Sequence, residues 1–84
     1  MESDVRSRIT DYLSRFFPVG ELRPEEDFFK LGLVNSLFAM QIVAFVEHEF
    51  GITVENDDLH PDNFRSVQAL DLFVSGKLST SAAQ

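Results

Sequence analysis

Ser36 is the side chain in this sequence whose type and position point most directly to chemistry. It follows Asn35 where a loop gives way to an apolar-rich stretch, and both residue types satisfy free backbone N–H groups at a helix start. A hydroxyl at a helix N-terminus lies near the positive end of the helix dipole, where a phosphate group is electrostatically favoured. A serine in this place is also a common structural cap. Local chemistry therefore leaves two interpretations of Ser36 open, a helix cap and a site of modification.

The other candidates for catalysis or metal binding are the histidines, His48 and His60, and the acidic pair Asp57-Asp58. The sequence has no Cys and no HExxH spacing, so a zinc site is not indicated. The acidic pair lacks the spaced ligands of a calcium loop and is more typical of a helix start. A serine hydrolase is also disfavoured, because residues 34–38 lack the G-x-S-x-G elbow. We therefore expect no catalytic residue and no metal, and we expect both histidines at the surface.

Length and composition predict one small globular domain. The chain has 84 residues, 44% hydrophobic residues with nine Phe, and a net charge of −7. An acidic surface repels nucleic acid and anionic membranes, so neither is expected as a partner. No run approaches the ~18 apolar residues that span a bilayer, and the N-terminus lacks the apolar core of a signal peptide. We expect a cytoplasmic monomer.

The elements that must position Ser36 are predicted to be helices, which makes the fold all-α. The first is amphipathic, is capped by Ser3 or Asp4, and is ended by Pro18 and Gly20; its apolar positions are Val5, Ile9, Tyr12, Leu13 and Phe16. The loop 17–35 is expected to pack over the helices through its apolar residues, with a short helical turn from Pro24, and to present Asn35-Ser36.

Three further helices complete the prediction. One runs from about Ser36 to Phe50 and stops at Gly51. A short third helix is capped within residues 56–59 and limited by Pro61, after an extended connection at 52–54. A last helix begins after the cap Ser66 and stops at Gly76, with Val67, Leu70, Phe73 and Val74 on its buried side. We expect a domain over 1–78 and a disordered tail over 79–84.

The helix from Ser36 to Phe50 has two faces when its residues are placed ~100° apart. The predicted core face consists of Ala39, Ile42, Val43, Val46 and Phe50, with Phe38 and Phe45 at its edge. The opposite face consists of Ser36, Leu37, Met40, Gln41, Ala44, Glu47 and His48. This outer face is unusually apolar beside Ser36, which indicates a contact surface for a partner.

The motifs Asp27-Phe28-Phe29, Leu31-Gly32 and Asn35-Ser36-Leu37, followed by a helix that ends in an acidic cluster and Phe50-Gly51-Ile52, resemble the acyl and peptidyl carrier protein family. The resemblance covers nearly the whole chain. It implies a four-helix carrier bundle with three longer helices, one short third helix and a long first loop. It also implies that a Mg-dependent phosphopantetheinyl transferase moves 4′-phosphopantetheine from coenzyme A to Ser36. The arm then holds an acyl group as a thioester, and the carrier itself catalyses nothing.

Three positions depart from the most acidic members of the family, namely Asn35, Phe38 and Gln41. The loss of negative charge there weakens steering toward basic enzyme patches and favours apolar contacts. The predicted docking residues are Asn35, Leu37, Phe38, Met40, Gln41, Ala44, Glu47 and His48.

The run from Gly32 to Ile52 is similar to discrete polyketide-pathway carriers that load three-carbon units of the glyceryl or methoxymalonyl type. This resemblance implies as partners a loading enzyme, tailoring dehydrogenases and a polyketide synthase acyltransferase or ketosynthase. A free-standing peptidyl or aminoacyl carrier of non-ribosomal peptide synthesis is the alternative within the family. A helical adaptor in which Ser36 is only a cap is the alternative from another class.

Overall fold

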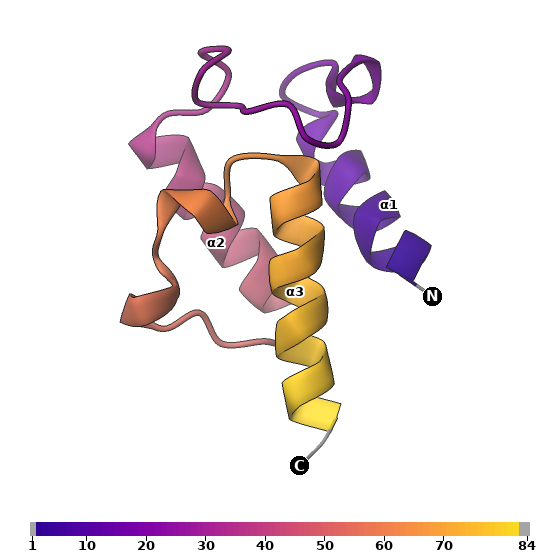
Figure 1. The fold of residues 1–84 in the computed structure, drawn as a ribbon, viewed down its shortest axis with the longest axis vertical. Coiled ribbons are helices and arrows are strands. Elements are labelled where there is room, and N and C mark those ends of the chain that lie inside the picture. The colour runs from indigo at the N-terminus through magenta and orange to yellow at the C-terminus, as the bar shows by residue number, and fades with distance from the viewer. Residues whose placement is uncertain (1, 83–84) are drawn as a thin grey trace.

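The computed structural model describes residues 2–82, with side chains from 4 to 79, and this part of the chain is helical without strands. Its three α-helices are α1 (Glu2–Leu13), α2 (Ser36–Phe50) and α3 (Val67–Ala82) (Figure 1). Three short 3₁₀ turns are η1 (Val19–Glu21), η2 (Asn56–Asp58) and η3 (Pro61–Asn63). The predicted all-α fold is confirmed, and the predicted short third helix is a 3₁₀ turn.

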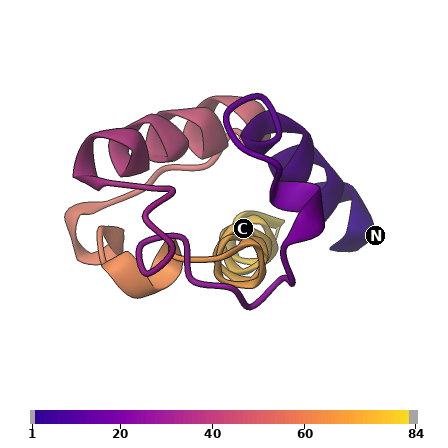
Figure 2. The ribbon, with the colours of Figure 1, turned by 90° about the horizontal axis from the view of Figure 1, so that it is seen from above.

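The helices and the first loop surround one apolar core. Viewed from above, α3 is seen nearly end-on, with α1 and α2 beside it and the loop between α1 and α2 running past it on the side away from α2 (Figure 2). The buried apolar side chains come from all three helices and from both long connections; they include Ile9, Leu13, Phe28, Val34, Ile42, Val46, Ile52, Phe64, Leu70 and Val74. None of the helices within the described range is long and apolar enough to cross a bilayer.

The first loop is held down along its length. Phe28 is 0% exposed, its ring packs edge-on against Phe17 at 5.4 Å, and its N–H donates to the carbonyl of Arg65 at 2.6 Å. The carbonyl of Pro24 accepts from the N–H of Gln68 at 2.8 Å, so the loop also satisfies a backbone donor at the start of α3. The expectation that this loop packs over the helices is confirmed.

The ends of α1 and the course of the first loop differ from the prediction. α1 begins at Glu2, before the predicted caps Ser3 and Asp4, and it ends at Leu13, before Pro18. The first loop has its helical turn at η1, whereas Pro24 lies in an ordinary turn. Proline and glycine mark positions where a helix cannot continue. α1 nevertheless ends before Pro18, because the chain turns so that Phe17 and Val19 pack into the core.

The last helix also differs, because α3 continues through Gly76 to Ala82 and the predicted stop there is wrong. A helical Gly costs about 1 kcal/mol relative to Ala, whereas buried Val74 and partly buried Leu78 pack on the core on either side of it. The division into a domain, 1–78, and a disordered tail, 79–84, stays a prediction, although α3 reaches Ala82 and residues 83–84 lie outside the described range.

α1 and α3 are joined by a part-buried ion pair. Asp71 is 5% exposed, and its Oδ2 accepts from Nε and Nη2 of Arg6 at 3.1 and 2.9 Å. Its Oδ1 accepts from the hydroxyl of Ser75 at 3.2 Å. The carboxylate is therefore satisfied from both helices.

We expect Arg6→Ala to lower the free energy of unfolding by about 1–3 kcal/mol, because it leaves the buried Asp71 carboxylate without its cation. Urea denaturation followed by circular dichroism measures this change. Arg8→Ala is the matched control, since Arg8 pairs at 3.5 Å with the exposed carboxylates of Asp4 and Glu49 and is expected to cost about 0–1 kcal/mol. Equal effects of the two changes would contradict the role assigned to Arg6.

Candidate functional site

The helix cap at the start of α2 is Asn35, and Ser36 is the first helical residue. Asn35 has extended backbone angles, and its Oδ1 accepts from the N–H of Phe38 at 2.8 Å while its carbonyl accepts from Ala39 at 2.8 Å. Ser36 is exposed, and within residues 2–82 its hydroxyl has no hydrogen-bond partner. The geometry therefore favours a site of modification over a helix cap at Ser36, because Asn35 caps the helix and leaves the serine hydroxyl accessible.

Buried residues of the first loop fix the entry into α2. Phe28 and Val34 lie in the core, and just before them in the chain Asp27 Oδ1 accepts from the N–H groups of Phe29 and Lys30 at 2.9 and 3.2 Å. Gly32 has φ = 74°, a conformation that favours glycine, and it turns the chain toward Val34. Ser36 is therefore presented by an ordered loop with hydrogen bonds of its own.

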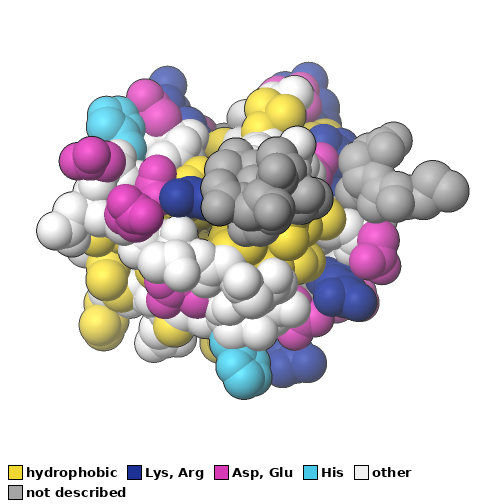
Figure 3. Space-filling model, turned by 90° about the horizontal axis from the view of Figure 1, so that it is seen from below, with side chains coloured by type: hydrophobic (Ala, Val, Ile, Leu, Met, Phe, Trp, Pro, Cys, Tyr) yellow, Lys and Arg dark blue, Asp and Glu magenta, His cyan; other side chains and the backbone are white. Residues whose placement is uncertain are grey.

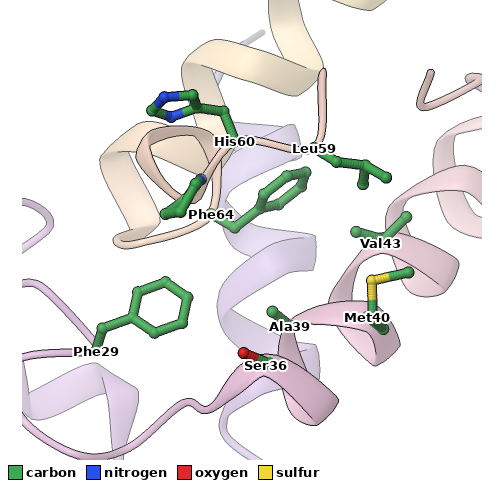
Figure 4. A pocket seen from close by; sticks show the side chains of 9 residues that line it. Phe29, Ser36, Ala39, Met40, Val43, Leu59, His60 and Phe64 are labelled. Carbon is green, nitrogen blue, oxygen red and sulfur yellow. The ribbon is translucent and has the colours of Figure 1, made fainter. Parts of the chain in front are cut away.

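A pocket of about 190 Å³ lies beside Ser36, between α2 and the connector, which we define as residues 51–66 (Figure 4). One wall comes from α2 and consists of Ser36, Ala39, Met40 and Val43, which follow helical spacing. The opposite wall consists of Leu59, His60, Pro61 and Phe64, and Phe29 closes the side toward the first loop. Leu59 points toward Val43, whereas the His60 ring turns away from α2 (Figure 4). Apart from Ser36 and His60, the lining is apolar.

The connector wall of this pocket was not predicted as part of a site. His60 is exposed, as expected from the sequence, and Phe29 is partly buried, packs against the core and also lines the pocket. Leu59, Pro61 and Phe64 carried no helical or strand period that could have marked them. Pro61 begins η3 instead of only limiting the turn before it, because its fixed φ suits a first helical position.

The connector is anchored by hydrogen bonds and one close ion pair. The Glu47 carboxylate accepts from the N–H of Val54 at 2.8 Å, and Asp58 Oδ2 lies 2.6 Å from Nζ of Lys77. The hydrogen bond from Lys77 lowers the pKa of the Asp58 carboxyl, and the N–H of Glu55 lowers it further. The same bond to Asp58 raises the pKa of Lys77. Within residues 2–82, no group of three or more acidic or histidine side chains is arranged to hold a metal ion.

The predicted docking residues are exposed to different degrees. Leu37 is 73% exposed, and Phe38 is partly buried against Phe16 at 4.8 Å. Glu47 is also partly buried and is engaged by the connector. The remaining members are exposed, namely Asn35, Met40, Gln41, Ala44 and His48. The outer face is thus accessible around Ser36, while Glu47 has a structural role.

Comparison with known proteins defines the class to which this fold and site belong. Residues 4–70 match the family model of the phosphopantetheine attachment site, so the chain belongs to that family. It is an acyl carrier protein whose attachment domain takes covalent 4′-phosphopantetheine. Carriers of this family are generally not catalytic and interact with phosphopantetheinyl transferases and acyl-handling enzymes. The exposed, unbonded hydroxyl of Ser36 at a helix N-terminus fits such a group.

A curated relative is similar over almost the full length. It is aminoacyl carrier protein 1 of Bradyrhizobium diazoefficiens, which is 27% identical over 85 residues, covering 96% of this chain and 93% of the relative.

Proposed function

We propose that Ser36 is the attachment point of 4′-phosphopantetheine and that the protein delivers acyl groups as a carrier. The observation that supports this most directly is the free hydroxyl of Ser36, since Asn35 already provides the helix cap. In the attachment step Ser36 Oγ forms a bond to phosphorus and loses its proton, and the pyrophosphate bond of coenzyme A breaks with adenosine bisphosphate as leaving group. The attached 4′-phosphopantetheine supplies a terminal thiol, which this Cys-free chain lacks.

The residues around Ser36 have distinct parts in this function. Asn35 and the first loop hold the hydroxyl in solvent at the start of α2, where a transferase can reach it. The helix N-terminus stabilises the negative charge of a phosphodiester. Met40, Leu59 and Phe64 line an apolar pocket in which part of an attached group is shielded from water.

The attachment is tested by incubating the protein with coenzyme A, Mg²⁺ and a broad-specificity phosphopantetheinyl transferase and recording the intact mass. We expect a gain of one phosphopantetheine group per chain. An unchanged mass, under conditions that modify a control carrier, would contradict the carrier function. It would favour the alternative function, that of a helical adaptor.

We propose that the cargo is a three-carbon unit of the glyceryl or methoxymalonyl type, used as a polyketide starter or extender. The similarity of residues 32–52 to discrete carriers of such units supports this cargo. An aminoacyl cargo is the second candidate, favoured by the relative from Bradyrhizobium diazoefficiens. Two loading experiments on the holo protein distinguish the three-carbon cargo from the aminoacyl cargo. One offers a glycolytic bisphosphate, and the other offers amino acids with adenylation enzymes. Preferential amino-acid loading would refute the three-carbon cargo.

We propose further that enzymes dock on the outer face of α2 through apolar contacts. The first turn of α2 has no acidic residue, and Leu37 is the most exposed large apolar side chain beside Ser36. We expect Leu37→Glu to lower kcat/KM of the transferase about tenfold, or about 1.4 kcal/mol, because it places a charge in an apolar contact.

Leu72→Glu is the matched control for this change, since Leu72 is 68% exposed but lies on α3. We expect it to leave the transferase rate unchanged. Equal losses in the two variants would show that the outer face of α2 is not the docking surface.

A further inference from the structure

Lys77 extends from the part of α3 beyond Gly76 to the connector. Its Nζ lies 2.6 Å from Oδ2 of Asp58, and both side chains are only about a quarter exposed, at 25% and 24%. The same ammonium lies 5.8 Å from the centre of the Phe73 ring. Around the end of α3, basic, acidic and apolar side chains are exposed together (Figure 3). Lys77 thus interacts with the connector and with an aromatic ring of its own helix.

Asp58 is the residue around which η2 and η3 are organised. Its Oδ2 also accepts from the N–H of Glu55 at 3.0 Å. Its carbonyl accepts from the N–H of His60 and from Nδ2 of Asn63, both at 2.8 Å. Fixing Asp58 therefore fixes the segment from Glu55 to Asn63.

Both residues that Lys77 contacts, Asp58 and Phe73, are next to residues of the connector wall of the pocket. Leu59, which lines the pocket, follows Asp58 directly. Phe64, which also lines it, packs edge-on against Phe73 at 5.4 Å. The opposite wall belongs to α2, which is anchored independently by core residues such as Ile42 and Val46. The width of the pocket consequently depends on where the connector is held.

We infer that Lys77 is a positioning residue for the pocket beside Ser36, which holds the connector against α3 and thereby limits the acyl groups that the pocket shields. This inference rests on the proposed function in so far as the arm on Ser36 brings the acyl group. With the ammonium of Lys77 removed, the connector wall moves more freely, so the pocket no longer limits a bulkier acyl chain in the same way.

The position of the connector is tested first in the protein without an arm, by hydrogen exchange. The N–H groups of Leu59, His60 and Phe64 donate within the connector at 3.1, 2.8 and 3.0 Å. In Lys77→Gln we expect them to exchange about two- to fivefold faster, because a partly exposed ion pair contributes modestly to local stability. A uniform increase that includes the amides of α1 would overturn the inference, since it would show only a global loss of stability.

Two further variants sharpen this comparison. Lys30→Gln removes the same charge from the first loop, at the only other lysine of the sequence, and is expected to exchange like the wild type. Lys77→Arg retains the charge and is expected to restore slow exchange in the connector. Identical behaviour of Lys30→Gln and Lys77→Gln would overturn the inference.

The effect on the pocket is tested with octanoyl-phosphopantetheine, transferred to Ser36 from octanoyl-coenzyme A. The amide chemical shifts of Ala39, Val43, Leu59 and Phe64 are compared between holo and octanoyl forms. The quantity compared is the difference in amide chemical shift between the octanoyl and holo forms. For Leu59 and Phe64, we expect this difference in Lys77→Gln to deviate about twofold from its wild-type value. In Lys77→Arg and Lys30→Gln we expect the wild-type value. Wild-type shifts in Lys77→Gln would overturn the inference. If the wild type accepts no arm, the proposed function fails, and the hydrogen exchange alone still decides the role of Lys77.

Discussion

The Ser36→Ala variant is expected to gain no phosphopantetheine at all, a complete loss of the mass increase that the wild type shows with coenzyme A and a transferase. The reason is chemical, since alanine has no oxygen to form the bond to phosphorus. No neighbour can substitute, because Asn35 and Leu37 carry no hydroxyl. The measurement is the intact mass of each variant after incubation with excess transferase.

The same variant is expected to keep its stability, which distinguishes an attachment site from a structural cap. Asn35 Oδ1 satisfies the N–H of Phe38 and Ser36 makes no capping bond, so the free energy of unfolding is expected to change by only a few tenths of a kcal/mol. A loss of about 1 kcal/mol or more would show that Ser36 acts as a cap after all.

Ser14→Ala is the control for the loss of mass increase. Ser14 is also exposed, but its hydroxyl donates to the carbonyl of Asp11 at the end of α1. We expect this variant to take up the arm fully. A mass gain in Ser36→Ala that disappears only in another serine variant would move the attachment point.

The Phe28→Ala variant is expected to lose about 3–5 kcal/mol of its free energy of unfolding, because a fully buried aromatic side chain is removed from the core. Small domains have about 5–15 kcal/mol in total, so this variant is expected to be partly unfolded near room temperature or above. The ring contacts Phe17, and the backbone N–H donates to the carbonyl of Arg65, so removal of the ring also loosens the first loop from the connector. Urea denaturation measures the stability, and the transferase rate reports how well Ser36 is still presented.

Leu31→Ala in the same loop serves as the comparison, since Leu31 is 47% exposed. We expect it to cost less than about 1 kcal/mol, because little apolar surface leaves water at that position on folding. If Leu31→Ala were as costly as Phe28→Ala, the loop would not be anchored through Phe28.

Much of α2 follows from local sequence. The cap of its first turn requires an acceptor such as Asn35, and Gly51 adopts φ = 66° at its end, which a residue with a Cβ rarely does. The apolar period of α2 also indicates correctly that Ile42, Val43 and Val46 face the core. Ser66 likewise accepts from the N–H of Ala69 at 3.0 Å, as its predicted role as the cap of α3 requires.

The errors occur where long-range packing outweighs local preference. Gly76 would end an isolated helix, but the contacts of Val74 and Leu78 with the core extend α3 beyond it. The sequence predicts Asp58 as part of a helix start, which its hydrogen bond from the N–H of Glu55 supports, but its partner Lys77 is nineteen residues away and no local pattern connects the two.

The sequence by itself determined that this is a small acidic helical protein with a serine at the start of its central helix, because composition, helical period and capping residues act over a few neighbouring positions. Only the structure shows that the serine hydroxyl is unbonded, because Asn35 and Ser36 are both suitable capping residues and the sequence does not say which of them accepts the capping bond. Only the tertiary structure placed Leu59, Pro61 and Phe64 opposite α2, because their positions depend on contacts with α3 formed across the fold.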